Sequence, residues 1–163
     1  MILTIDPGIH TGIALWKNWE DLFPKTYEIF AGEKGTHEEK LYTLQAKFTQ
    51  LVDNIEEQMI VSPVDDSNLH IFIEGVEHWA GNLKSQTAST RGNLSFLSYM
   101  VGVYCAVCFA KDFPVKIIPA RVWKGQMSKS VTATRVFKIN EVKYKSSHVI
   151  DAVGMGFAMQ GIL

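Results

Sequence analysis

The sequence has few cysteines and no long apolar run. Two cysteines among 163 residues cannot build a disulfide framework, which favours a reducing, intracellular compartment. No uncharged apolar run approaches the roughly 20 residues of a membrane helix, which excludes an integral membrane protein. The start of the chain has no basic segment before an apolar stretch, so we expect no secretory signal. Hydrophobic residues make up 47% of the chain, too many for a disordered protein, and at this length we expect one domain, residues 1–163.

The sequence also lacks an excess of positive charge, since 16 basic and 17 acidic side chains give a net charge of −1. These charges are unevenly distributed. Residues 1–80 contain 5 basic and 14 acidic side chains, whereas residues 81–163 contain 11 and 3. Within the second half, residues 111–145 contain 9 basic and 2 acidic side chains. Such a segment either binds a polyanion such as nucleic acid or forms a solvated basic surface, and charge alone favours neither.

Hydrophobic periodicity and turn signals predict an α/β fold. We expect strands at residues 1–6, 12–18, 27–30, 70–74 and 115–118, and helices at residues 36–59, 86–110, 120–124, 130–140 and 146–160. Thr36 and Glu39 have the spacing of a capping box, which marks the start of the first helix. Three consecutive strands followed by strand–helix–strand units imply a mixed sheet with helices on its faces.

The helix expected at residues 86–110 is apolar around nearly its whole circumference in its second half. It therefore lies in the core or in a subunit interface. Cys105 and Cys108 on this helix have C-x-x-C spacing, but no second pair of ligands accompanies them, so we predict core packing and not zinc binding or redox chemistry. We also expect core or edge packing for Trp16 and Trp19.

Two acidic residues share a position at the end of a short apolar strand. Asp6 ends the first expected strand and Glu74 ends the fourth, and a glycine follows closely in both cases. Ligands of open α/β sheets bind at the carboxyl ends of the strands, so these carboxylates converge if the two strands are neighbours. His148 and Asp151 are three residues apart and lie on the same face of the last helix. The four side chains are therefore candidates for one site.

Three carboxylates and one imidazole suit a hard divalent cation, Mg²⁺ or Mn²⁺. Two such ions about 4 Å apart can activate a water molecule and stabilise the leaving oxygen of a phosphodiester. Each residue alone also has a simpler interpretation. Asp6 could cap its turn, Glu74 could pair with a lysine, and His148 and Asp151 could form an ordinary surface pair. We further expect Gly154 and the nearby Gly156 to let the last helix approach the sheet closely.

The motifs around these residues resemble those of RuvC-type Holliday junction resolvases, in particular the small members of phages and viruses. The motifs are residues 5–14 (IDPGIHTGIA), residues 73–74 (IE) and residues 148–152 (HVIDA). The resemblance extends from residue 1 to about residue 158. It implies a ribonuclease H-like α/β fold with a central five-stranded mixed sheet flanked by helices. It also implies a homodimeric, Mg²⁺-dependent endonuclease that cleaves four-way DNA junctions by two-metal-ion hydrolysis. Many relatives have Asp at the position of His148, and others have His.

The resemblance also implies a catalytic metal-binding set and a set of DNA contacts. The metal ligands are Asp6, Glu74, His148 and Asp151. The DNA-binding residues are Trp79, Arg91, Arg121, Lys124 and Lys129. Trp79 follows the fourth strand, where some relatives place an aromatic residue that stacks on bases at the junction centre, although it could equally pack beneath a loop. The lysines and arginines are suited to phosphate contacts.

We expect a junction nuclease that acts inside the cell, on the DNA, with forks and flaps as further substrates. Two other functions are alternatives to it. A non-catalytic branched-DNA-binding protein could keep the same fold, but all four candidate metal ligands are present. An actin-like ATP-binding domain also begins with a strand-end aspartate and glycines. That fold needs two such lobes, for which 163 residues are too few.

Overall fold

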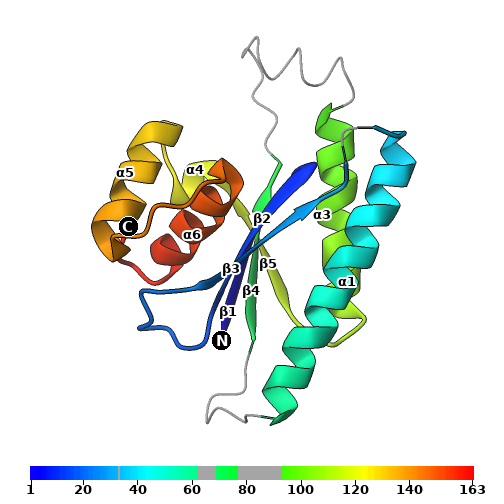
Figure 1. The fold of residues 1–163 in the computed structure, drawn as a ribbon, viewed down its shortest axis with the longest axis horizontal. Helices are drawn as coiled ribbons and strands as arrows, with labels where there is room; N and C mark the ends of the chain where they lie inside the picture. Colours follow the sequence, from blue (N-terminus) through cyan, green and yellow to red (C-terminus); the bar gives the residue numbers. More distant parts are fainter. Residues whose placement is uncertain (33, 62–68, 77–92) are drawn as a thin grey trace.

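A five-stranded mixed sheet forms the centre of the computed structural model, which describes residues 1–32, 34–61, 69–76 and 93–163 (Figure 1). Its strands are β1 (Ile2–Asp6), β2 (His10–Trp16), β3 (Lys25–Phe30), β4 (His70–Gly75) and β5 (Val115–Pro119). Their order across the sheet is β3-β2-β1-β4-β5. The first three strands pair in antiparallel fashion, whereas β1, β4 and β5 run parallel, as the chain order predicted.

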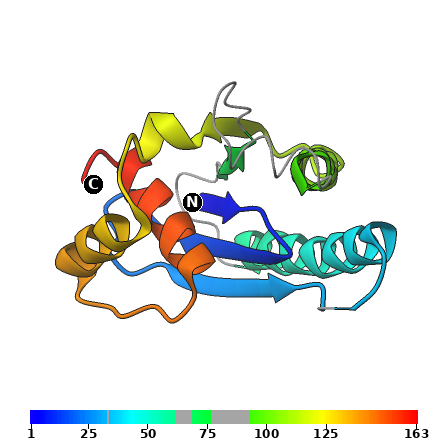
Figure 2. The same ribbon diagram turned by 90° about the horizontal axis from the view of Figure 1, so that it is seen from above.

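Helices cover both faces of this sheet. They are α1 (His37–Val61), α3 (Asn93–Phe109), α4 (Ala120–Trp123), α5 (Lys129–Asn140) and α6 (Ser147–Met159). Helices α1 and α3 enclose one hydrophobic core with the sheet, and α6 encloses a second core on the opposite face (Figures 1 and 2). Of the helices in the described ranges, none is both long enough and apolar enough to cross a membrane.

The second strand begins and ends two residues earlier than predicted. Asn18 lies in a turn, because its backbone N–H donates to the Asp21 carboxylate at 2.9 Å and its carbonyl accepts from the Asp21 N–H at 3.4 Å. This turn ends the strand at Trp16, and the hairpin register places Gly12 opposite Asp6. The positions of β1 and β4 agree with prediction to within a residue, so the two strand-end carboxylates are placed as expected.

The capping box at the start of α1 is confirmed. The Thr36 N–H donates to Glu39 Oε2 at 2.7 Å, and the Glu39 N–H donates to Thr36 Oγ1 at 3.2 Å. This arrangement satisfies backbone groups that the first helical turn leaves unpaired. The predicted apolar stripe faces the sheet and α3, with four fully covered residues, Leu44, Phe48, Val52 and Ile55.

Helix α6 lies directly on the sheet. A Cβ atom on Gly156 would overlap the Trp16 ring, so only glycine allows this approach. Thr4 Oγ1 in β1 donates to the Ala152 carbonyl of α6 at 2.7 Å, with both residues buried. The expectation for Gly154 was wrong, because this glycine faces side chains of α4 and α5 and not the sheet. The same helix therefore uses one glycine against the sheet and the other against its neighbouring helices.

The predicted packing residues take the expected positions. Cys105 and Cys108 are buried free thiols in the core between α3 and the sheet, and burial raises the pKa of Cys108 to about 12. A thiol with so high a pKa is a poor nucleophile and metal ligand. Trp16 is fully buried, and Trp19 packs edge-on against the Phe72 ring at 6.4 Å.

Candidate active site

Asp6 and Glu74 meet at one end of the sheet. Strands β1 and β4 are parallel neighbours with Ile5 opposite Ile73, so the residues that follow these two lie side by side. Asp6 is only 8% exposed, and Glu74 is half-buried. The predicted convergence of two strand-end carboxylates is therefore present in the fold.

Helix α6 brings two further side chains to this end of the sheet. A Cβ atom on Gly12 in β2 would overlap the backbone of His148, so the first turn of α6 rests on the glycine of the hairpin motif. His148 Nδ1 lies 2.7 Å from Asp6 Oδ2. Asp151, one turn further along α6, is 7% exposed. His148 and Asp151 thus belong to the same cluster as the strand-end carboxylates and are not a separate surface pair, and Asp6 is hydrogen-bonded to the histidine.

The segment after β5 supplies the partners of the other two carboxylates. Trp123 Nε1 donates to Glu74 Oε2 at 3.0 Å, and Lys124 Nζ donates to Asp151 Oδ1 at 2.7 Å. The Lys124 side chain is only 15% exposed. The sequence allowed a pairing of Glu74 with a lysine, but Lys124 is bound to Asp151. Trp123 was not among the predicted site residues, and its adjacency to Lys124 was the one sequence signal for it.

Burial and neighbouring charge raise the pKa of Glu74 and of Asp6. Burial raises the pKa of Glu74 to about 7, and the negative charges of Asp6 and Asp151 act in the same direction. Burial also raises the pKa of Asp6, although its hydrogen bond to His148 opposes this. That same hydrogen bond raises the pKa of His148. The cluster therefore holds negative charge that Lys124 and the imidazole neutralise only in part.

A hard divalent cation fits this donor set chemically. Mg²⁺ and Mn²⁺ prefer carboxylate oxygens, and a cation near Asp6, Glu74 and Asp151 would offset the repulsion that raises the pKa of Glu74. Within the described ranges, no three His, Cys, Asp or Glu side chains form a ready-made metal cage. Instead His148 and Lys124 bind oxygens of Asp6 and Asp151. A cation would have to share these oxygens or replace Lys124.

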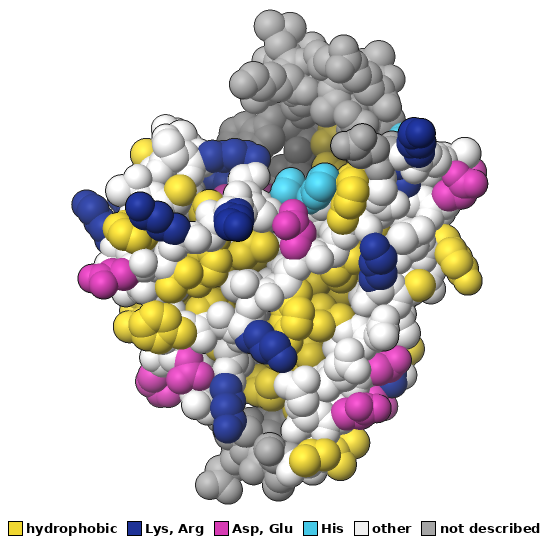
Figure 3. Space-filling model, viewed as in Figure 1, with side chains coloured by type: hydrophobic (Ala, Val, Ile, Leu, Met, Phe, Trp, Pro, Cys, Tyr) yellow, Lys and Arg dark blue, Asp and Glu magenta, His cyan; other side chains and the backbone are white. Residues whose placement is uncertain are grey.

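The predicted DNA-binding residues fall into three groups according to where they lie. Arg121 on α4 and Lys129 at the start of α5 are exposed, and the charge of Lys129 is near enough to lower the pKa of His148. Lys124 lies inside the carboxylate cluster and not on an open surface. Trp79 and Arg91 lie outside the described residues. Figure 3 shows lysine and arginine side chains gathered over the helices beside the histidines.

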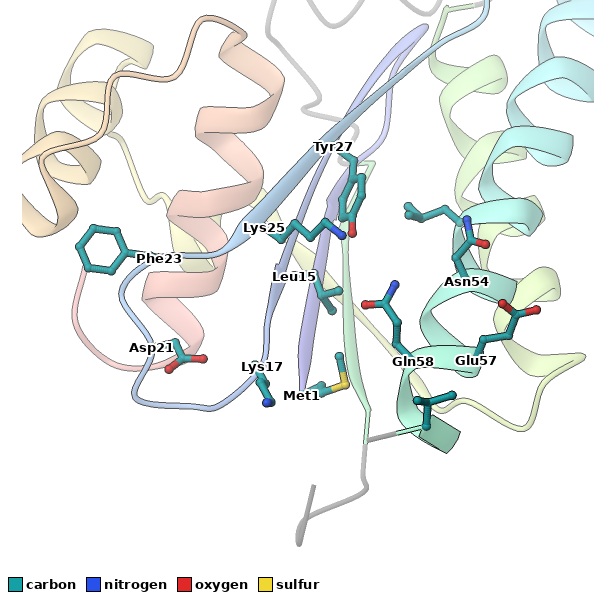
Figure 4. Close-up of a pocket in the computed structure, with 12 residues that line it drawn as sticks. Met1, Leu15, Lys17, Asp21, Phe23, Lys25, Tyr27, Asn54, Glu57 and Gln58 are labelled. Atoms are coloured by element: carbon teal, nitrogen blue, oxygen red, sulfur yellow. The ribbon is translucent and has the colours of Figure 1, made fainter. Parts of the chain in front are cut away.

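A separate hollow of about 640 Å³ lies away from this cluster, between β2, β3 and the C-terminal half of α1 (Figure 4). Its apolar floor includes Leu15 and Tyr27, and its rim carries both signs of charge, with Lys25 on β3 and Glu57 on α1. None of the four candidate metal ligands lines it. Because its charges are mixed, its chemistry does not select a class of ligand.

This sheet order, with helices on both faces, is the ribonuclease H-like fold. More particularly, the chain is similar in structure to RuvC of Thermus thermophilus. In complex with a Holliday junction substrate, that protein matches 96% of this chain and 90% of its own, with a TM-score of 0.64 and 16% identity. A second structure of the T. thermophilus protein matches with a TM-score of 0.57 and 15% identity, over 99% and 96% of the two chains.

No protein-family model and no curated protein sequence matches this chain. The RuvC resemblance inferred from three short motifs is therefore confirmed at the level of the fold, although the sequence identity is only 15–16%.

Proposed function

We propose that this protein is a divalent-metal-dependent endonuclease that is selective for branched DNA such as four-way junctions. One observation carries the proposal. Three carboxylates from distant parts of the chain, Asp6, Glu74 and Asp151, converge beside His148 at the carboxyl ends of β1 and β4. The structural similarity to a RuvC solved with a Holliday junction substrate supports branched DNA as the substrate.

In this proposal the four side chains hold Mg²⁺, with Mn²⁺ as a substitute, at a two-metal site. When bound, the ions would lower the pKa of the attacking water and neutralise charge on the phosphate. The hydrogen bond between His148 Nδ1 and Asp6 leaves Nε2 for a ligand, the usual arrangement of a carboxylate-supported histidine. Trp123 fixes the Glu74 carboxylate through its indole N–H. Lys124, once released from Asp151, supplies a positive charge close to the scissile phosphate.

DNA contacts and assembly belong to the same proposal. The exposed Arg121 and Lys129 lie in the basic segment and would contact phosphates, with Trp79 and Arg91 as further predicted contacts. Helix α3 is mostly apolar and leaves Tyr99 65% exposed, which supports a homodimer that packs through this helix. A two-fold symmetric dimer would provide two active sites for the two paired strands of a junction. Forks and flaps would be additional substrates. Sedimentation with and without DNA tests the dimer, and a monomer under both conditions contradicts it.

The central experiment compares wild type with Asp6→Asn on labelled four-way junctions, forks and duplexes. With Mg²⁺ we expect the variant to lose cleavage by about 100-fold or more, since a metal ligand is removed, while junction binding in Ca²⁺ is retained. Asp53→Asn is the matched control, because Asp53 is a half-buried aspartate away from the site that pairs with Lys111. Normal cleavage by Asp6→Asn would contradict the metal site. A wild-type protein that binds junctions but does not cleave them with any divalent cation would establish the non-catalytic alternative.

A further inference from the structure

His10, the first residue of β2, lies beside His148. The two imidazole rings are nearly parallel, with 7° between their planes and 6.1 Å between their centroids. This separation is within the range of offset aromatic pairs. His10 precedes Gly12 by two residues and so lies on the same side of the strand, the side on which the first turn of α6 rests. His10 therefore flanks one side of the His148 ring.

The His148 ring needs such a neighbour to have a defined orientation. Its hydrogen bond to Asp6 fixes the position of Nδ1, but one bond allows the ring to swing about that point. The His148 side chain is 33% exposed, so solvent does not restrict this motion. Gly8 lies near Cε1 of the ring, where a Cβ added to the glycine would be 3.5 Å away. A flanking ring therefore limits the rotation of His148 on one side.

His10 is itself held in place by β3. Its ring stacks on Phe30 with 4.0 Å between the centroids and 14° between the planes. His10 and Phe30 are opposite each other in the register of β2 and β3, so the sheet places the two rings together. His10 Nδ1 also lies 3.4 Å from Glu28 Oε1, on the same face of β3. One ring face and one ring edge of His10 are thus constrained.

The same glutamate connects β3 to the start of α6. Ser146 Oγ donates to Glu28 Oε1 at 2.9 Å, and Ser146 is the residue that immediately precedes the helix. The first turn of α6 is therefore tied to the edge strand twice. One tie is the Ser146–Glu28 hydrogen bond, and the other is the stack of Phe30, His10 and His148.

We propose that His10 is a positioning residue. Its ring, supported by Phe30 and Glu28, holds the His148 imidazole in the orientation that binds Asp6 and leaves Nε2 for a ligand. The consequence for catalysis rests on the proposed function, in which His148 ligates a divalent cation. Residues that orient a metal ligand from outside typically change activity or metal affinity by 10- to 100-fold when they are removed.

The test compares His10→Ala, which removes the ring, with His10→Phe, which keeps the stack. His37→Ala is the matched control, because His37 is also an exposed histidine that packs on a phenylalanine, but at the start of α1. With Mg²⁺ and four-way junctions we expect His10→Ala to lose about 10- to 100-fold in cleavage rate. His10→Phe should stay within about threefold of wild type, and His37→Ala should be unchanged. Equal losses in His10→Ala and His10→Phe would overturn the proposal.

A second readout does not depend on cleavage. Imidazole nitrogen NMR on the metal-free proteins, assigned with His148→Gln, reports the hydrogen bond of His148 Nδ1. We expect one sharp set of His148 signals in wild type and His10→Phe, and exchange-broadened signals in His10→Ala. Phe30→Leu, which removes the ring that supports His10, should broaden the His148 signals as well. It replaces His10→Ala in the test if that variant does not fold. Unchanged His148 signals in His10→Ala and Phe30→Leu would overturn the proposal. If wild type cleaves nothing, the proposed function fails, while the NMR comparison still decides the role of His10.

Discussion

Glu74→Gln is expected to stabilise the metal-free protein at alkaline pH. Glu74 sits beside two other carboxylates, Asp6 and Asp151, and its pKa is about 7 instead of 4.5. Glutamine has nearly the same shape and keeps an oxygen that accepts the Trp123 N–H, but it carries no charge. The substitution therefore removes the charge and leaves the packing and the hydrogen bond in place.

The size of the effect follows from the pKa of Glu74. Between pH 4.5 and 7 the folded protein binds this proton more tightly than the unfolded chain does. The free energy of unfolding of wild type therefore falls as the pH rises through this interval. At about 1.4 kcal/mol per pH unit, the loss from Glu74 alone is about 3 kcal/mol by pH 8. We expect Glu74→Gln to lack this loss and so to exceed wild type by up to about 3 kcal/mol at pH 8.

The assay is urea unfolding monitored by circular dichroism, with chelator present, at pH values from 4.5 to 8. Protein concentration is held constant so that any self-association contributes equally to both proteins. The two proteins should differ little at pH 4.5 and diverge as the pH rises. Addition of Mg²⁺ at pH 8 should then stabilise wild type more than Glu74→Gln, because the cation offsets the repulsion that glutamine has already removed.

Two results would refute this reasoning. Equal stability of the two proteins at pH 8 in chelator would show that ionised Glu74 costs nothing in the folded state. A wild-type protein that is more stable than Glu74→Gln at pH 8, and that loses this advantage as the pH falls, would show the opposite sign, as expected of a carboxylate stabilised by a positive partner.

Three further predictions concern the contact between α6 and the sheet. Gly156→Ala should lower the free energy of unfolding by about 1–3 kcal/mol in urea titrations, because the new Cβ would overlap Trp16; an unchanged midpoint would contradict this packing. Thr4→Val should cost about 0.5–1.5 kcal/mol by the same assay, since it removes the hydrogen bond to the Ala152 carbonyl, and no loss would show that this bond is not formed. Gly12→Ala should displace the first turn of α6, measured as altered amide chemical shifts in that turn, and unaltered shifts would refute the close approach.

The sequence by itself determined the approximate positions of the strands and helices and the four candidate ligands. Asp6 and Glu74 could be placed at strand ends because apolar runs and turn residues are local signals. The capping box predicted where α1 begins, and helical spacing placed His148 and Asp151 on one face of the last helix. These inferences required only neighbours within a few residues along the chain.

Only the tertiary structure decided which side chains meet within the site. Glu74 binds Trp123 across 49 residues, and Asp6 binds His148 across 142. Such pairs depend on the order of the strands and on how closely α6 approaches the sheet, which local periodicity does not encode. The stack of His10 on His148 has the same origin, since it exists because a glycine in β2 lets the first turn of α6 rest on the strand.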